Sequence, residues 1–173
     1  MKVNVNAGHC KSGIGYGAAY GGYKESAIVR LVATEVIRLL KQKGHTVTDS
    51  TVDSAPTQGD YLKSVVRKAN ASSADLFISI HCNASATHQG HGVEVYTWKG
   101  RKHDVGVRLC YEISKLGFRN RGVKNGDHLY VIQNTTMEAV LIELFFLDNA
   151  TDQNLYTKVG YRSIAKAIVE AIQ

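Results

Sequence analysis

Four residues that lie far apart in the chain have the chemistry of a zinc hydrolase site: His9, Glu25, His81 and Glu143. Zn²⁺ binds imidazole nitrogen and carboxylate oxygen, and a catalytic zinc typically has three protein ligands with a water in the fourth position. His9, Glu25 and His81 supply such a set. Glu143 lies in the apolar run 138–147, where an unpaired carboxylate is costly to bury. The sequence therefore predicts a metal held by the first three residues, with Glu143 as general acid and base.

Each of these residues, taken alone, also has a structural explanation. His9 follows a glycine and fits a loop residue, and His81 fits a cap of its sheet. Glu25 opens a predicted helix, where the helix macrodipole favours a carboxylate. Glu143 fits the acidic partner of a buried arginine. A metal site accounts for all four oddities together, which favours the functional interpretation, and Glu94 is the substitute ligand if Glu25 fails.

The elements that must position these residues alternate between strands and helices. Strands are predicted at residues 2–8, 45–48, 76–80, 92–98, 129–132 and 139–144, and helices at residues 25–43, 60–71, 104–116 and about 156–172. This alternation predicts an α/β fold with right-handed crossovers and a mostly parallel, twisted sheet that has helices on both faces. His9 and His81 would then stand just beyond the carboxyl ends of two strands, where open α/β sheets bind ligands.

Composition indicates one domain that spans residues 1–173. The chain has 173 residues and 44% hydrophobic content, without a break that would suggest a second domain. It enters its first strand directly, so we expect no signal peptide, and no apolar run reaches the roughly 18 residues of a membrane span. Three cysteines are too few for a disulfide framework. Because Cys10 and Cys82 each follow a proposed ligand, we expect them near one another, as inert thiols rather than metal ligands.

The net charge is +6 and the pI is about 9.2, which suggests an acidic partner. Basic residues gather at positions 99–108 and 119–124, where they fit either a solvated face or a surface that binds an anionic bacterial wall. Recognisable nucleic-acid modules are missing, so we expect no nucleic-acid partner. The segment 11–23 contains five glycines and three tyrosines but does not match a phosphate-binding loop, and we interpret it as a mobile active-site loop.

Several ordered motifs resemble one known family. They are NAGH at 6–9, Glu25 at the first helix, ADLFISIHCNA at 74–84, GVEVY at 92–96, RGVK at 121–124, AVLIE at 139–143 and FLDN at 146–149. With these motifs the sequence resembles the zinc-dependent N-acetylmuramoyl-L-alanine amidases of type 3, and within them the catalytic domains of phage endolysins from Gram-positive hosts. The similarity extends over nearly the whole chain.

The resemblance implies one zinc ion held by His9, Glu25 and His81, with Glu143 as the catalytic carboxylate, and a sheet of about six strands. It implies cleavage of the amide between the lactyl group of N-acetylmuramic acid and L-alanine of the peptidoglycan stem peptide, with a zinc-bound water as nucleophile. We expect a monomer that reaches the bacterial wall after a lysis event or by non-classical export. Two alternatives stay open: a zinc peptidase or deacetylase acting on another amide, and a non-catalytic wall-binding module.

Overall fold

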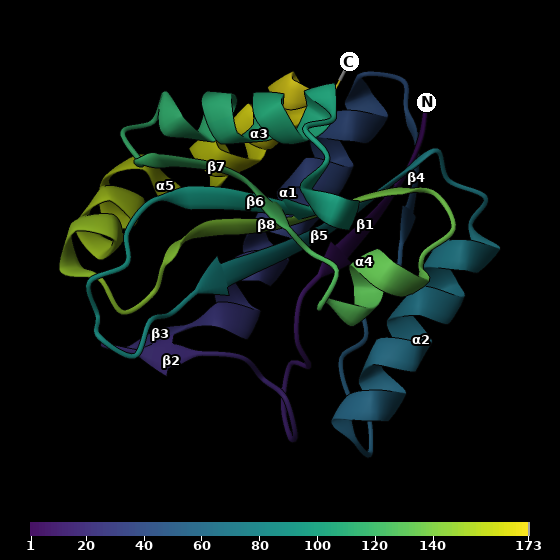
Figure 1. The fold of residues 1–173 in the computed structure, drawn as a ribbon, viewed down its shortest axis with the longest axis horizontal. Coiled ribbons are helices and arrows are strands. Elements are labelled where there is room, and N and C mark those ends of the chain that lie inside the picture. The colour runs from purple at the N-terminus through teal and green to yellow at the C-terminus, as the bar shows by residue number, and fades with distance from the viewer. Residues whose placement is uncertain (173) are drawn as a thin grey trace.

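A sheet of six strands forms the centre of the protein in the computed structural model, which describes residues 1–172 (Figure 1). The strands are β1 (Lys2–Ala7), β4 (Thr46–Asp49), β5 (Leu76–Asn83), β6 (Val93–Thr97), β7 (Asn120–Asn125) and β8 (Glu138–Phe146). Their order in the sheet is β4-β1-β5-β8-β6-β7, and only the β6–β8 pair is antiparallel. The prediction of a mostly parallel sheet is therefore confirmed.

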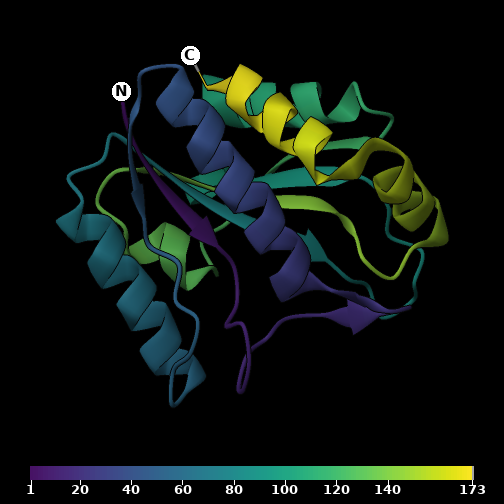
Figure 2. The ribbon, with the colours of Figure 1, turned by 180° about the vertical axis from the view of Figure 1, so that it is seen from behind.

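Helices cover both faces of the sheet, as the sequence predicted. The helices are α1 (Glu25–Gln42), α2 (Gln58–Ala71), α3 (Asp104–Ser114), α4 (Tyr130–Asn134) and α5 (Ala150–Ala171), with a short 3₁₀ turn at Trp98–Gly100. Seen from behind, α1 and α5 run side by side across the sheet (Figure 2), and α3 packs with them over one large core cluster. Helices α2 and α4 lie on the opposite face over a smaller cluster (Figure 1).

Helices α2 and α4 cover only part of their face of the sheet. Phe77 of β5 and Leu141 of β8 pack under α2 and α4. Side chains at even spacings along a strand point to the same face, so His81 and Glu143 follow them on that face, farther along the same two strands. The register pairs His81 with Glu143 and Glu143 with Glu94 of β6. A row of three ionisable side chains therefore crosses the sheet where the helical cover ends.

Two strand predictions differ from the structure. The apolar run 129–132 was predicted as a strand but belongs to α4, where Val131 and Ile132 are buried against the α2 side. Periodicity does not separate a short apolar strand from one turn of a buried helix. The sixth strand is instead β7, whose sequence NRGVKN has little apolar alternation because it is a half-buried edge strand that pairs only with β6.

Other boundaries shift by a few residues, and two features are new. Helix α5 begins six residues before the predicted start at Tyr156, because the Asn149 side chain caps it by accepting from the amides of Thr151 and Asp152. Non-helical backbone at Gly160 interrupts it. The glycine-rich segment contains a small hairpin formed by β2 (Ala19–Tyr20) and β3 (Tyr23–Lys24). Within residues 1–172, no helix combines the length and the apolar content needed to cross a membrane.

Candidate metal centre

Three ligand atoms from distant segments converge at one point of the structure. The His9 Nε2 atom lies 3.1 Å from Glu25 Oε1, and the His81 Nδ1 atom lies 3.2 Å from both of these atoms. In a tetrahedral zinc site with ligand distances of about 2.0–2.1 Å, ligand atoms lie about 3.3 Å apart from one another. The triangle formed by these three atoms is therefore the size of one face of such a tetrahedron. Two imidazoles and one carboxylate also form the donor set that zinc accepts, so the residues fit the predicted ion.

His9 lies in the loop after β1 in an unusual backbone conformation. Its φ of 64° is in the left-handed region, which is uncommon for a residue with a side chain. Two contacts hold it there: the Arg30 guanidinium of α1 donates to the His9 carbonyl oxygen at 2.9 Å, and the His9 Nδ1 atom lies 3.1 Å from the Gly15 carbonyl oxygen. The second contact fixes the ring so that Nε2 is available as a ligand.

Glu25 is the first residue of α1, but its carboxylate does not cap that helix. The side chain is buried, Oε1 accepts from the Cys82 amide at 3.0 Å, and Oε2 accepts from the Ala18 amide at 2.8 Å. Burial alone would raise the pKa of Glu25, but hydrogen bonds from His81 and His9 outweigh it and hold the pKa well below the ordinary carboxyl range. Glu25 is therefore an ionised, fully bonded carboxylate aimed at the two imidazoles.

His81 lies inside β5, not beyond its end as the sequence predicted, because the strand continues to Asn83. The candidate site therefore extends from the end of β1, where His9 lies as predicted, onto the face of the sheet at His81. The His81 Nε2 atom is 3.1 Å from the Ser79 hydroxyl, which donates to Asn6 Oδ1 at 2.8 Å. Burial lowers the pKa of His81 despite the nearby charge of Glu25. The neutral imidazole, which is the form that binds metal, is thus favoured, with Nδ1 directed at the ligand triangle.

We expect Ser79→Ala to lower zinc affinity about 10- to 100-fold, the loss typical when a partner that orients a metal-binding histidine is removed. The Ala variant leaves the His81 ring without its hydrogen-bond acceptor and leaves Asn6 Oδ1 without its donor. Competition with a chromogenic chelator measures the affinity. Ser72→Ala is a matched control because that hydroxyl donates to the Ala69 carbonyl at the end of α2, away from the ligands. Equal affinities in the wild type and Ser79→Ala would contradict an orienting role for Ser79.

Glu143 lies on the neighbouring strand β8 and pairs in register with His81, one of the three candidate ligands. Its residue is partly exposed, but the Oε2 atom is buried and has no hydrogen-bond partner among residues 1–172. Burial, together with the charges of Glu25 and Glu94, raises the pKa of Glu143 well above the ordinary carboxyl value. Glu143 does not have the arginine partner of the structural explanation; Glu94 of the neighbouring strand β6 has it instead, because Arg121 Nε donates to Glu94 Oε2 at 2.6 Å. Glu143 is therefore left as an unsatisfied carboxyl group that is free to exchange a proton.

Comparisons with known proteins agree with this geometry. The profile of the N-acetylmuramoyl-L-alanine amidase family matches residues 3–173. The chain belongs to this amidase family. It is 35% identical to the endolysin of Bacillus phage SPP1 and covers 64% of that protein, with 98% of the chain aligned. It is 34% identical to an uncharacterized protein of Clostridium perfringens (strain 13 / Type A), with 99% of the chain aligned and 51% of that protein covered. The chain thus spans between one half and two thirds of the length of these two relatives.

A solved endolysin catalytic domain has the same fold. The catalytic domain of the CD27L endolysin, which targets Clostridia Difficile, superimposes with a TM-score of 0.90 at 31% sequence identity. The alignment covers 99% of this chain and 96% of that domain. The α/β architecture that the sequence predicted is therefore the architecture of an amidase catalytic domain.

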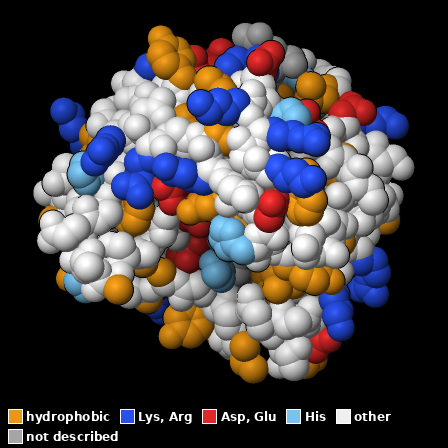
Figure 3. All heavy atoms as spheres, viewed as in Figure 1, with side chains coloured by type: hydrophobic (Ala, Val, Ile, Leu, Met, Phe, Trp, Pro, Cys, Tyr) orange, Lys and Arg blue, Asp and Glu red, His pale blue; other side chains and the backbone are white. Residues whose placement is uncertain are grey.

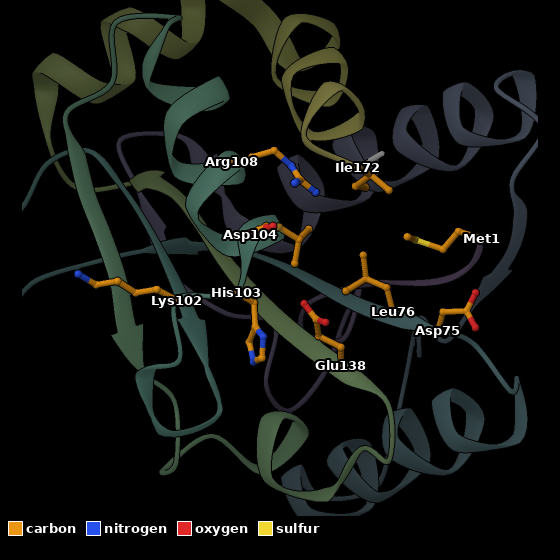
Figure 4. A pocket seen from close by; sticks show the side chains of 10 residues that line it. Met1, Asp75, Leu76, Lys102, His103, Asp104, Arg108, Glu138 and Ile172 are labelled. Atoms are coloured by element: carbon orange, nitrogen blue, oxygen red, sulfur yellow. The ribbon is translucent and has the colours of Figure 1, made fainter.

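The candidate site is a hollow on the face of the sheet that α2 and α4 leave open. Figure 3 shows recessed acidic side chains beside histidines near the centre of this face, with lysine or arginine side chains on the rim. A cavity of about 610 Å³ lies elsewhere, at the opposite ends of the strands. It is lined by Leu76 and Glu138, the first residues of β5 and β8, and by Arg108 (Figure 4). That cavity contains none of the residues that the sequence predicted for the site.

We predicted that the two cysteines next to the ligands lie near one another, but the structure places them in different core clusters. Cys82 follows His81 in β5 and therefore points to the opposite face, where it joins the large core cluster. Cys10 packs in the smaller cluster on the other side of the sheet. Burial raises the pKa of both thiols, which keeps them protonated, in agreement with the prediction of inert buried cysteines.

Three residues that support the candidate site were not identified from the sequence: Arg30, Ser79 and Asn6. Arg30 lies on the same helix as Glu25, and Ser79 and Asn6 are fully or almost fully buried in β5 and β1. A polar residue in an otherwise apolar buried strand was the available signal for Ser79 and Asn6, since buried polar groups need partners. Arg30 gave no such signal, because a charged residue on a helix is usually solvated, and its partners His9 and Asp53 lie in loops that are distant in the sequence.

Proposed function

We propose that residues 1–173 form a zinc-dependent catalytic domain that cleaves peptidoglycan at the amide between the lactyl group of N-acetylmuramic acid and L-alanine. One observation carries the proposal: the unsatisfied carboxyl group of Glu143 lies beside a His-Glu-His triangle of zinc dimensions. Membership of the amidase family and the similarity to endolysins support the substrate. His9, Glu25 and His81 hold the metal, and Glu143 is the catalytic residue.

Zinc bound at the triangle would polarise the scissile carbonyl and acidify the attacking water. The protein groups account for the proton transfers. The Glu143 carboxylate accepts the proton of the attacking water, and the same carboxyl group then protonates the alanine nitrogen so that it leaves as an amine. The buried surroundings that raise the Glu143 pKa suit this double role, because an ordinary exposed carboxyl group is too weak a base near neutral pH.

Two further proposals concern how the domain acts. The basic residues at 99–108 and 119–124 favour attraction to the anionic bacterial wall, where the substrate is located. The domain works as a monomer, because every group proposed for the chemistry comes from one chain. Sedimentation velocity checks the second proposal, and the salt dependence of wall binding checks the first.

Digestion of purified cell walls, followed by mass analysis of the soluble products, tests the proposed function. The zinc-loaded protein is expected to release stem peptides with a free alanine amino group, and a chelator is expected to stop this release until zinc is restored. Glycan strands should stay uncut. Release of peptides that begin at another residue would indicate a peptidase, release of acetate would indicate a deacetylase, and wall binding without any release would indicate a non-catalytic module.

The pH profile gives a separate prediction. Because the pKa of Glu143 is raised, its base form is lost as pH falls through a value above the ordinary 4.5, so the acid limb of kcat/KM should lie above that pH. Glu94→Gln removes one of the two negative charges that raise this pKa, and the acid limb should therefore move to lower pH. Glu138→Gln, an exposed position on the same strand as Glu143, is the control and should leave the limb in place. A shift to higher pH in Glu94→Gln would contradict this assignment.

A further inference from the structure

Glu94 is the centre of a polar network beside Glu143. It is buried, and its Oε1 atom accepts from Asn83 Nδ2 and from the Tyr96 hydroxyl, both at 2.8 Å. Its Oε2 atom accepts from Arg121 Nε at 2.6 Å. Three donors therefore share the charge of this carboxylate, and Glu94 needs no further partner. The network also immobilises the guanidinium of Arg121, which lies with its central carbon 4.8 Å from the centre of the Phe146 ring.

Arg121 uses only part of its hydrogen-bonding capacity in this network. A guanidinium that serves only to neutralise a carboxylate usually engages it with two parallel bonds. Here the bond to Glu94 comes from Nε, and neither Nη atom donates to another of residues 1–172. The side chain is 29% exposed, so these donors are accessible to solvent. The protein thus holds a rigid, half-buried cation with unused donors at the rim of the candidate site.

The position of Arg121 relative to Glu143 determines which part of a bound substrate the Arg121 donors can contact. Glu94 pairs with Glu143 across β6 and β8, and Arg121 comes from β7, the next strand. Two strand spacings of about 4.8 Å place the Arg121 backbone about 10 Å from that of Glu143. An extended peptide advances about 3.3–3.6 Å per residue. Arg121 is therefore within reach of a group one to three residues away from the amide at Glu143.

We propose that Arg121 is a specificity-determining residue that binds a carboxylate of the stem peptide. The inference rests on the proposed function. In that substrate the lactyl carboxyl group is itself part of the scissile amide, so free carboxylates are found on the peptide side of the bond. The unused Nη donors of Arg121 suit a planar carboxylate. Lys124 pairs in register with Tyr96 and thus lies on the same face of β7, where it adds positive charge without a contact to Glu94.

The test compares two synthetic muramoyl peptides that differ at one group. Both carry the lactyl–alanine amide, and the residue after alanine carries either a free carboxylate or the corresponding carboxamide. We expect the zinc-loaded wild type to cleave the carboxylate peptide with a kcat/KM about 10- to 100-fold higher, mainly through KM, because a hydrogen bond to a charged group is lost in the carboxamide. In Arg121→Gln this ratio should fall to about 1. Lys115→Gln is the control, because Lys115 lies at the end of α3 on the other side of the sheet and pairs with Glu112 there, and its ratio should equal that of the wild type.

Arg121→Lys separates the binding role from the structural one, since it keeps a positive charge beside Glu94 but has no planar fork. Its ratio should fall between the wild type and Arg121→Gln, and thermal unfolding should show that it is folded. An unchanged ratio in Arg121→Lys and Arg121→Gln, or a wild-type ratio near 1, overturns the inference while leaving the amidase proposal intact. Cleavage of neither peptide by the wild type overturns the amidase proposal itself.

Discussion

Glu143→Gln is expected to keep its zinc and to lose about 10²- to 10⁴-fold in the rate of amide cleavage, the usual contribution of a general acid and base. Glutamine has nearly the same size as glutamate but cannot accept and return a proton. The Glu143 carboxyl group is not part of the ligand triangle, so metal binding should not depend on it. Wall digestion or muramoyl-peptide cleavage measures the rate, and elemental analysis of the dialysed protein measures the zinc.

The stability of the same variant gives an independent check. The wild-type Oε2 atom is buried without a hydrogen-bond partner among residues 1–172, and Glu143 carries a raised pKa. A neutral amide at this position removes the repulsion from Glu25 and Glu94, so we expect Glu143→Gln to unfold at the same temperature as the wild type or a higher one. Glu138→Gln on the same strand should leave the rate unchanged. Wild-type rates in Glu143→Gln would exclude Glu143 as the proton carrier.

Gly8→Ala is expected to disrupt the metal centre without replacing any ligand. An added Cβ atom at this position would overlap the imidazole ring of His81, which lies directly against the glycine. The ring cannot stay in place, so His81 Nδ1 should leave the ligand triangle. Loss of an orienting partner alone costs about 10- to 100-fold in metal affinity, and displacement of a ligand should cost more. We expect zinc to be lost on dialysis and the amidase activity to be lost with it.

Gly59→Ala is the matched control for this variant. Gly59 lies in α2, and an added Cβ atom would meet only the Thr57 hydroxyl at an ordinary distance of 3.7 Å. Alanine is also the better helix former, by about 1 kcal/mol. Gly59→Ala should therefore retain zinc and activity and should be at least as stable as the wild type. Stoichiometric zinc in Gly8→Ala would show that His81 is not held where the structure places it, or does not bind the metal.

The sequence predicted the fold class because the signals are local. Apolar residues recur at helical spacing in α1 and form continuous buried runs in β5 and β8, and each pattern can be recognised within its own segment. The same reasoning failed at β7 and α4. A polar edge strand is stabilised by pairing with β6, and a five-residue helix is stabilised by packing against α2, and neither partner is adjacent in the sequence.

For the candidate site too, the sequence predicted one part and the tertiary structure decided the rest. Residue types and the resemblance to a known family were enough to nominate His9, Glu25, His81 and Glu143, and the structure brings the first three within 4.8 Å of one another. Their roles as ligands and as proton carrier stay predictions that the experiments above test. The position of His9 beyond the end of β1 was predicted, but the placement of His81 on the sheet face followed only from the length of β5 and its pairing with β8.

By itself the amino-acid sequence determined an α/β chain with two imidazoles and two carboxylates that needed an explanation, because residue chemistry and hydrophobic period are properties of short segments. The tertiary structure decided which of these groups have partners. In the structure Arg121 pairs with Glu94, and Glu143 Oε2 has no hydrogen-bond partner among residues 1–172. The Ser79 hydroxyl orients the His81 ring. These outcomes depend on register between strands that lie far apart in the chain, and a shift of one residue would turn every side chain of a strand to the other face.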